Sequence, residues 1–331
     1  MKSRREILLR AAVIGVLTLL PLLLVEIGLR LSGFSFHLYP EEIRVGWPNP
    51  RIIRDAFLED PDLYYVRRDY QAILDEGRAR RCAVVFMGDS CTDYGTYPDL
   101  FGARLASHAP ATTWLNVGTG GYSSYQGLRQ FERDVVPLRP KIVTFYFGWN
   151  DHWRGFGVAD KDLVRIDHAW IHRLRRVRLV QLLTRALVGH SARARRSEPI
   201  QRVSEEDFRA NLTAFARTAR HQGITPVLLT APSAHERGHE PAYLKDTFLP
   251  DLGELVPIHE RYAGIVREVA RAEDAALCDL AAEFQGLPRR DVQERYFKKD
   301  GIHLKPAGDE VIARSLERCF AEHGLLDLLR R

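Results

Sequence analysis

Residues 84–90 of this 331-residue chain read VVFMGDS, and this stretch decides how the protein folds. Its apolar part suits a strand that is buried on both faces, and it stops at Gly88 and Asp89. A strand that ends in this way delivers the hydroxyl of Ser90 to the rim of a sheet. Working outward, the pattern predicts strands at about 83–87, 113–117, 142–147, 225–230 and 275–280, and helices at about 97–109, 123–134, 203–222, 254–272 and 306–322. This alternation predicts a parallel sheet with helices on both faces.

A carboxylate stands three residues before an imidazole near the far end of the chain, in Asp300 and His303. The spacing lets Asp300 reach His303 on one turn of chain and fix its tautomer. A serine, a histidine and an acid are the groups that nucleophilic acyl transfer needs. Here they follow the chain order Ser, Asp, His.

Two further pieces each end a predicted strand with glycine and a polar residue. They read NVGTGGYS at residues 116–123 and FYFGWND at residues 145–151. Glycine allows a backbone N–H to approach a ligand closely, and an asparagine amide is a second kind of donor. Donors that converge on one point stabilise a tetrahedral oxyanion.

These four pieces resemble the four sequence blocks of the SGNH (GDSL) hydrolase superfamily, in the order of that family. The resemblance covers about residues 82–322. It implies a flavodoxin-like three-layer α/β/α sandwich and an esterase or acyltransferase that uses no metal and no cofactor. It also implies Ser90 as nucleophile, His303 as base and Asp300 as the group that orients the histidine.

The same resemblance implies an oxyanion hole built from the N–H of Ser90, the N–H of Gly121 and the amide of Asn150. Cys91 is a rival nucleophile, but a thiol is reactive only as the thiolate. We expect Asp151 to hold its loop by accepting backbone N–H groups, and His152 to lie at the rim of the site.

The first 33 residues are predicted to be a cytoplasmic tail and a signal-anchor helix. The hydrophobic zone from Ile7 to Leu29, broken by Arg10 and Glu26, approaches 23 residues, and a membrane span needs about 20. No small-x-small cleavage site follows it, although a cleaved signal peptide and a buried amphipathic helix remain alternatives. The basic residues before the zone place the N-terminus in the cytoplasm and the catalytic part outside, in the periplasm or extracellular space.

The rest of the chain divides into an irregular stalk at 34–80 and a hydrolase domain at 81–331, which carries a basic helical insert at 155–202. The insert has an apolar stripe at helical spacing with arginines around it. It is interpreted as a helix packed on the domain, as a helix against anionic lipid, or as a lid over the site. The stripe consists of Leu179, Leu182, Leu183, Ala186 and Leu187.

The chain has four cysteines, and an exported domain allows them to pair. Cys82 and Cys278 fall in predicted buried strands, so we expect buried free thiols rather than a disulfide. The net charge of +5 is local and accompanies no nucleic-acid-binding motif, so nucleic acid is excluded as a partner. A metal-dependent hydrolase is not favoured either, because the sequence has no His-Glu-x-x-His motif.

The sequence therefore predicts a membrane-tethered serine esterase that acts on an ester-bearing small molecule, glycan or lipid. Two alternatives stay open. One is an O-acyltransferase that passes the acyl group to a surface polysaccharide or lipid, and the other is an inactive tethered binding module.

Overall fold

The computed structural model describes residues 4–34, 56–155, 159–163, 177–194, 200–245 and 248–330. Its centre is a five-stranded sheet in which every neighbouring pair is parallel, in the order β4-β3-β5-β6-β7. The strands are β3 (Val84–Gly88), β4 (Trp114–Asn116), β5 (Ile142–Tyr146), β6 (Thr225–Leu229) and β7 (Ala276–Cys278). All five predicted strands are confirmed.

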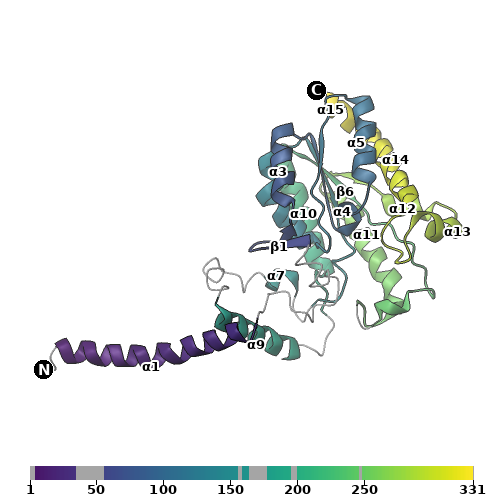
Figure 1. Cartoon of the computed structure of the whole chain (residues 1–331). Coiled ribbons are helices and arrows are strands. Elements are labelled where there is room, and N and C mark those ends of the chain that lie inside the picture. The colour runs from purple at the N-terminus through teal and green to yellow at the C-terminus, as the bar shows by residue number, and fades with distance from the viewer. Residues whose placement is uncertain are drawn as a thin grey trace.

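Successive side chains of the central strands point to opposite faces, and each face has its own apolar core. Helices α3 (Tyr70–Arg80), α6 (Ser124–Gln130), α10 (Glu205–His221) and α11 (Leu255–Ala272) cover one face. Helices α5 (Tyr97–His108), α12 (Leu280–Gln285), α14 (Pro306–Glu322) and α15 (Leu325–Arg330) cover the other (Figure 1). The predicted flavodoxin-like three-layer sandwich is thereby confirmed, and in a sheet with this strand order a ligand is expected at the carboxyl ends of β3 and β5.

The prediction of an irregular stalk is wrong for residues 56–80, which form regular elements. Residues 35–55 lie outside the described part. Strands β1 (Phe57–Asp60) and β2 (Tyr64–Arg67) pair antiparallel, and α3 follows them. Tyr64 and Tyr65 are buried in the core, because their rings cover apolar surface while their hydroxyls bond to backbone. This hairpin is part of the domain.

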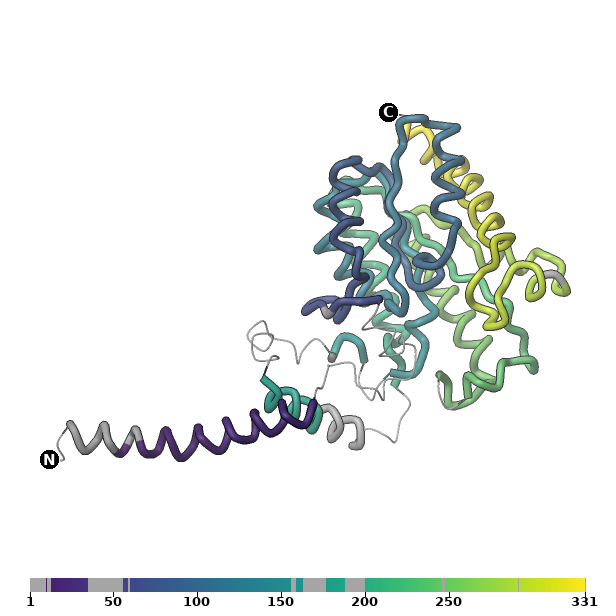
Figure 2. Tube along the Cα trace, in the orientation of Figure 1, coloured from purple at the N-terminus to yellow at the C-terminus, as the bar shows by residue number. Residues whose placement is uncertain are grey.

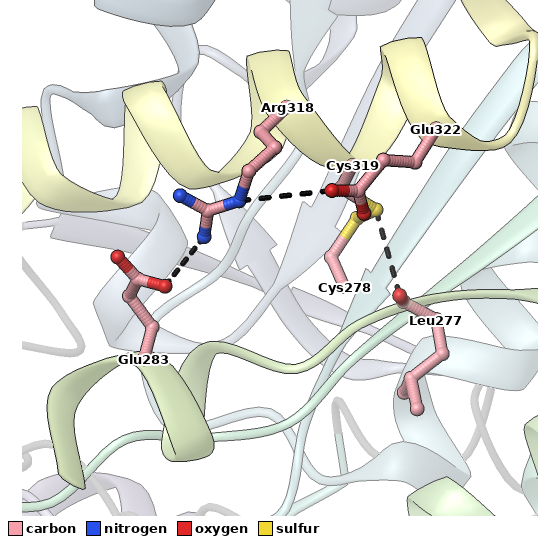
Figure 3. Close-up of a disulfide and its surroundings, with 6 residues drawn as sticks. All are labelled: Leu277, Cys278, Glu283, Arg318, Cys319 and Glu322. Carbon is pink, nitrogen blue, oxygen red and sulfur yellow. Dashed lines mark hydrogen bonds and ion pairs between the residues drawn. A yellow bond between two sulfur atoms is a disulfide. The ribbon is translucent and has the colours of Figure 1, made fainter. Parts of the chain in front are cut away.

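The expectation of free thiols is wrong for two of the four cysteines. Cys278, at the end of β7, and Cys319, on α14, form a disulfide across one face of the sheet (Figure 3). Cys82 and Cys91 are buried and free. The disulfide ties the edge strand to a covering helix, and it is consistent with an oxidising compartment.

The N-terminal helix α1 (Arg4–Leu31) projects away from the domain (Figure 2). Its segment Val13–Leu31 has a mean hydropathy of 2.1 and is long and apolar enough to cross a membrane. None of that segment is buried against the protein, so the alternative of a buried amphipathic helix is wrong. Helix α9 (Arg178–Ala194), from the basic insert, lies beside the C-terminal end of α1.

Candidate active site

Ser90, His303 and Asp300 form a continuous hydrogen-bonded chain although Ser90 and His303 are far apart in sequence. The Oγ atom of Ser90 lies 2.8 Å from Nε2 of His303, and Nδ1 of His303 lies 2.8 Å from Oδ2 of Asp300. Because Asp300 accepts the Nδ1 proton, Nε2 is left to accept the hydroxyl proton of Ser90. The arrangement is the one that serves nucleophilic acyl transfer.

Asp300 is held in its ionised form. Its other oxygen, Oδ1, accepts the N–H groups of Ile302 and His303, both at 2.9 Å. Burial alone would raise the pKa of Asp300, but the hydrogen bonds from the His303 ring and these two N–H groups outweigh it and lower the pKa to about 2. His235 fixes the same loop from the other side, since its Nε2 lies 2.8 Å from the carbonyl oxygen of Asp300.

Two segments next to Ser90 offer backbone N–H groups that are not used within the described part of the protein. Ser90 opens the short helix α4 (Ser90–Asp93), and N–H groups in the first turn of a helix have no acceptor within the helix. Gly121 has φ +83°, a left-handed conformation that favours glycine, in the loop between β4 and α6. Within the described residues no acceptor pairs with the N–H of Gly121.

Asn150 follows β5 and lies between the two segments. Its Nδ2 donates to the carbonyl oxygen of Tyr122 at 3.0 Å and, over a longer distance of 3.3 Å, to Oδ2 of Asp89. Both amide hydrogens therefore have protein partners here, and the longer bond is the one that a ligand oxygen displaces most readily. Asp89 caps α4 through the N–H of Cys91, and burial raises its pKa to about 6.

Asp151 behaves as the sequence predicts, since its Oδ1 accepts the N–H of Ser124 at the start of α6 at 2.8 Å. Burial raises its pKa to about 7. His152 was expected at the rim, and this is wrong, because its side chain is fully buried. Its Nε2 lies 3.2 Å from Nδ1 of His259, and burial lowers the pKa of both imidazoles, that of His259 to about 4.

Cys91 is not placed to act as a thiolate. It is buried, and burial followed by the neighbouring Asp89 raises the pKa of its thiol well above the ordinary value. Its Sγ donates to the carbonyl oxygen of Ile302. Trp149 is also buried and stacks on His259 at a centroid distance of 3.9 Å.

Sequence reasoning missed a buried ion pair directly behind the glycine loop. Arg202 has a fully buried side chain, and it pairs with Asp160 at 2.9 Å between Nη2 and Oδ2. Its Nη1 donates to the carbonyl oxygen of Gly121 at 2.8 Å, and its Nη2 donates to Oε1 of Gln126 at 3.0 Å. Asp160 in turn accepts the hydroxyl of Ser123 at 2.6 Å. The pair therefore fixes the segment that carries the Gly121 N–H.

The hairpin supports the same loop from the opposite direction. The hydroxyl of Tyr65 donates to the carbonyl oxygen of Gly120 at 2.7 Å, and the hydroxyl of Tyr122 donates to the carbonyl oxygen of Tyr65. Asp93, on α4, accepts the N–H of Gly120 at 2.8 Å and pairs with Arg67 of β2. No local sequence pattern indicates these partners of the glycine loop, because they lie on elements that are distant from it in the sequence.

The sequence matches the model of the GDSL-like lipase/acylhydrolase family over residues 86–311. An uncharacterized lipoprotein of Bacillus subtilis is 25% identical in an alignment of 262 positions that covers 73% of this chain and 90% of that protein. Among solved structures, a GDSL-like lipase candidate from Parabacteroides merdae has a TM-score of 0.50 at 15% identity, covering 72% of this chain and 95% of that chain. A GDSL-like lipase from Bacteroides thetaiotaomicron has a TM-score of 0.48 at 19% identity, covering 77% and 98%.

Proposed function

The chain belongs to the GDSL-like lipase/acylhydrolase family, and on this premise we propose that it is an esterase that works through an acyl-enzyme on Ser90. The observation that carries the proposal is the unbroken chain of two 2.8 Å contacts from Ser90 through His303 to Asp300. A serine hydroxyl is a weak nucleophile by itself, and an adjacent oriented base activates it.

In the first half-reaction, Oγ of Ser90 attacks the ester carbonyl while Nε2 of His303 takes its proton. Asp300 stabilises the imidazolium that forms and keeps its ring in place. The tetrahedral intermediate then collapses, and His303 passes its proton to the departing alcohol. Water, deprotonated by the same histidine, cleaves the acyl-enzyme and restores the hydroxyl.

The oxyanion of each intermediate is assigned to three donors, namely the N–H of Ser90, the N–H of Gly121 and the amide of Asn150. Asn150 reaches this role by exchanging its 3.3 Å bond with Asp89 for the substrate oxygen. The two backbone N–H groups need no such exchange, and one preorganised donor contributes about a hundredfold or more in rate.

We further propose that α1 anchors the protein and that the catalytic domain faces the periplasm or the extracellular space. The apolar segment Val13–Leu31 supports the anchor, and the disulfide between Cys278 and Cys319 supports the oxidising side of the membrane. This location favours ester-bearing glycans or lipids of the cell surface as substrates.

Hydrolysis of p-nitrophenyl esters by the full chain in detergent, from acetate to long acyl chains, tests the proposal. We expect turnover that Ser90→Ala abolishes and that Cys91→Ala preserves, because the two residues are adjacent but only Ser90 contacts His303. Turnover that survives in Ser90→Ala would refute the assignment. A fall in free acid release when a sugar acceptor is added would identify a transferase instead.

A further inference from the structure

Helix α9 exposes much of the apolar stripe for which the sequence allows packing on the domain, contact with anionic lipid or a lid over the site. The side chains of Leu182, Leu183 and Leu187 are 36%, 56% and 67% exposed. The polar Gln181 on the same helix is buried, and it accepts a hydrogen bond from Arg178 at 2.8 Å. An amphipathic helix that packs on its own domain has the opposite arrangement, so this apolar face requires a partner outside the described part of the chain.

The position of α9 indicates which partner this is. Its N-terminal turn is capped from α1, because Oε2 of Glu26 accepts the N–H of Leu179 at 2.8 Å. The other oxygen of Glu26 accepts a hydrogen bond from Arg30 on the next turn of α1. Figures 1 and 2 show α9 at the C-terminal end of α1, with the globular domain beyond that end. The helix therefore lies where the apolar segment of α1 ends.

We propose that α9 is a second membrane contact, whose face of Leu182, Leu183 and Leu187 enters the outer leaflet next to α1. This inference rests on the proposal that α1 remains on the protein as a span, and it does not depend on the reaction at Ser90. A helix of this kind lies in the interface with its apolar side among the acyl chains. Arg185 is exposed on the same helix, and a long basic side chain at this depth extends to the lipid headgroups.

The contact has a structural consequence for the site. The insert that carries α9 begins and ends near the active site, since Arg154 and Gln201 form a β-bridge and Arg202 pairs with Asp160. The domain is therefore joined to the bilayer at two places, the span itself and the helix that Glu26 caps. Two attachments fix the orientation of the catalytic face relative to the lipid surface, which a single attachment does not.

The test uses the full chain in nanodiscs of phosphatidylethanolamine and phosphatidylglycerol, with an environment-sensitive fluorophore on Leu187→Cys. The matched control is Asp327→Cys on α15, whose side chain is also 67% exposed but lies at the opposite end of the domain. Labelling is selective, because Cys82 and Cys91 are buried and the other two native cysteines are paired. Circular dichroism establishes that each labelled protein is folded, and intact mass establishes that it retains α1.

We expect the label at position 187 to shift to shorter wavelength and to lose emission when the lipids carry bromine on their acyl chains. The label at position 327 should do neither. Equal behaviour at the two positions, with α1 present by mass, would overturn the proposal. A blue-shifted label at 187 that bromine does not quench, with self-quenching between labelled chains, would assign the face to a second copy and would also overturn it.

Discussion

Replacing Arg202 by methionine tests whether its buried ion pair with Asp160 positions the loop that carries Gly121 or only stabilises the fold. Methionine keeps an unbranched side chain but removes the charge and every donor. The carbonyl oxygen of Gly121 then loses its 2.8 Å partner, and Asp160 stays as a buried carboxylate that retains the hydroxyl of Ser123. The substitution therefore perturbs stability and the geometry of the loop together, and the two effects have to be separated.

The stability effect follows from the burial of both partners, whose side chains are 0% and 1% exposed. Removing one member of a buried pair costs about 3–5 kcal/mol, because the other charge is left without compensation. In a domain of this size each kcal/mol lowers Tm by about 2–4 °C, so we expect a fall of roughly 6–20 °C. The matched control Arg209→Met breaks a pair with Glu268 in which the side chains are 47% and 56% exposed, and it should cost about 1 kcal/mol or less.

The catalytic effect is measured well below the Tm of the variant, as kcat and KM on p-nitrophenyl acetate. If Gly121 loses its orientation, kcat should fall by up to about a hundredfold while KM changes little, because the donor acts on the transition state. The double variant Arg202→Met/Asp160→Asn removes the uncompensated charge, so Tm should recover in part while kcat stays low. An unchanged kcat in a folded Arg202→Met protein would refute the positioning role.

Three further results are expected. Asn150→Ala should lower kcat about a hundredfold or more with a much smaller change in KM, and an unchanged kcat would remove its amide from the oxyanion hole. Converting Cys278 and Cys319 together to alanine should lower the free energy of unfolding by about 4 kcal/mol in urea titrations, because the disulfide closes a loop of 41 residues. An unchanged free energy of unfolding would show that the disulfide does not stabilise the fold. Because burial lowers the pKa of His259 in the folded protein, the unfolded chain binds more protons than the folded one between pH about 4 and 6.5. The contribution of neutral His259 to the free energy of unfolding is therefore complete above pH about 6.5 and is lost as the pH falls towards 4. The urea midpoint should fall as the pH is lowered through that window, and the fall should be smaller in His259→Gln. The same pH dependence of the midpoint in the variant would contradict this.

The sheet and its covering helices are predictable from sequence because each strand is a short apolar run that ends in glycine or a polar residue. That pattern also orders the site, since Ser90 and Asn150 follow the adjacent strands β3 and β5. Asp300 and His303 are local to each other, so their spacing alone indicates their contact.

The features that sequence reasoning missed all depend on contacts between distant segments. Arg202 reaches Gly121 across 81 positions, and one arginine among the many in a basic insert gives no sign of this. The pairing of Cys278 with Cys319 requires the distance between β7 and α14, which composition does not supply. The hairpin β1–β2 was missed because its strands are short and its tyrosines are buried for contacts with the glycine loop, not for a regular alternation.

The most direct test of the central claim is covalent trapping of the nucleophile. The full chain is treated with a fluorophosphonate, which phosphonylates an activated serine, and the product is measured by intact mass and peptide mapping. We expect one phosphonyl group on the peptide that contains Ser90, lost in Ser90→Ala and greatly slowed in His303→Ala, because we propose His303 as the base that activates the hydroxyl. A folded protein that gains no phosphonyl group, or gains it at a residue other than Ser90, would contradict the assignment of Ser90 as the nucleophile.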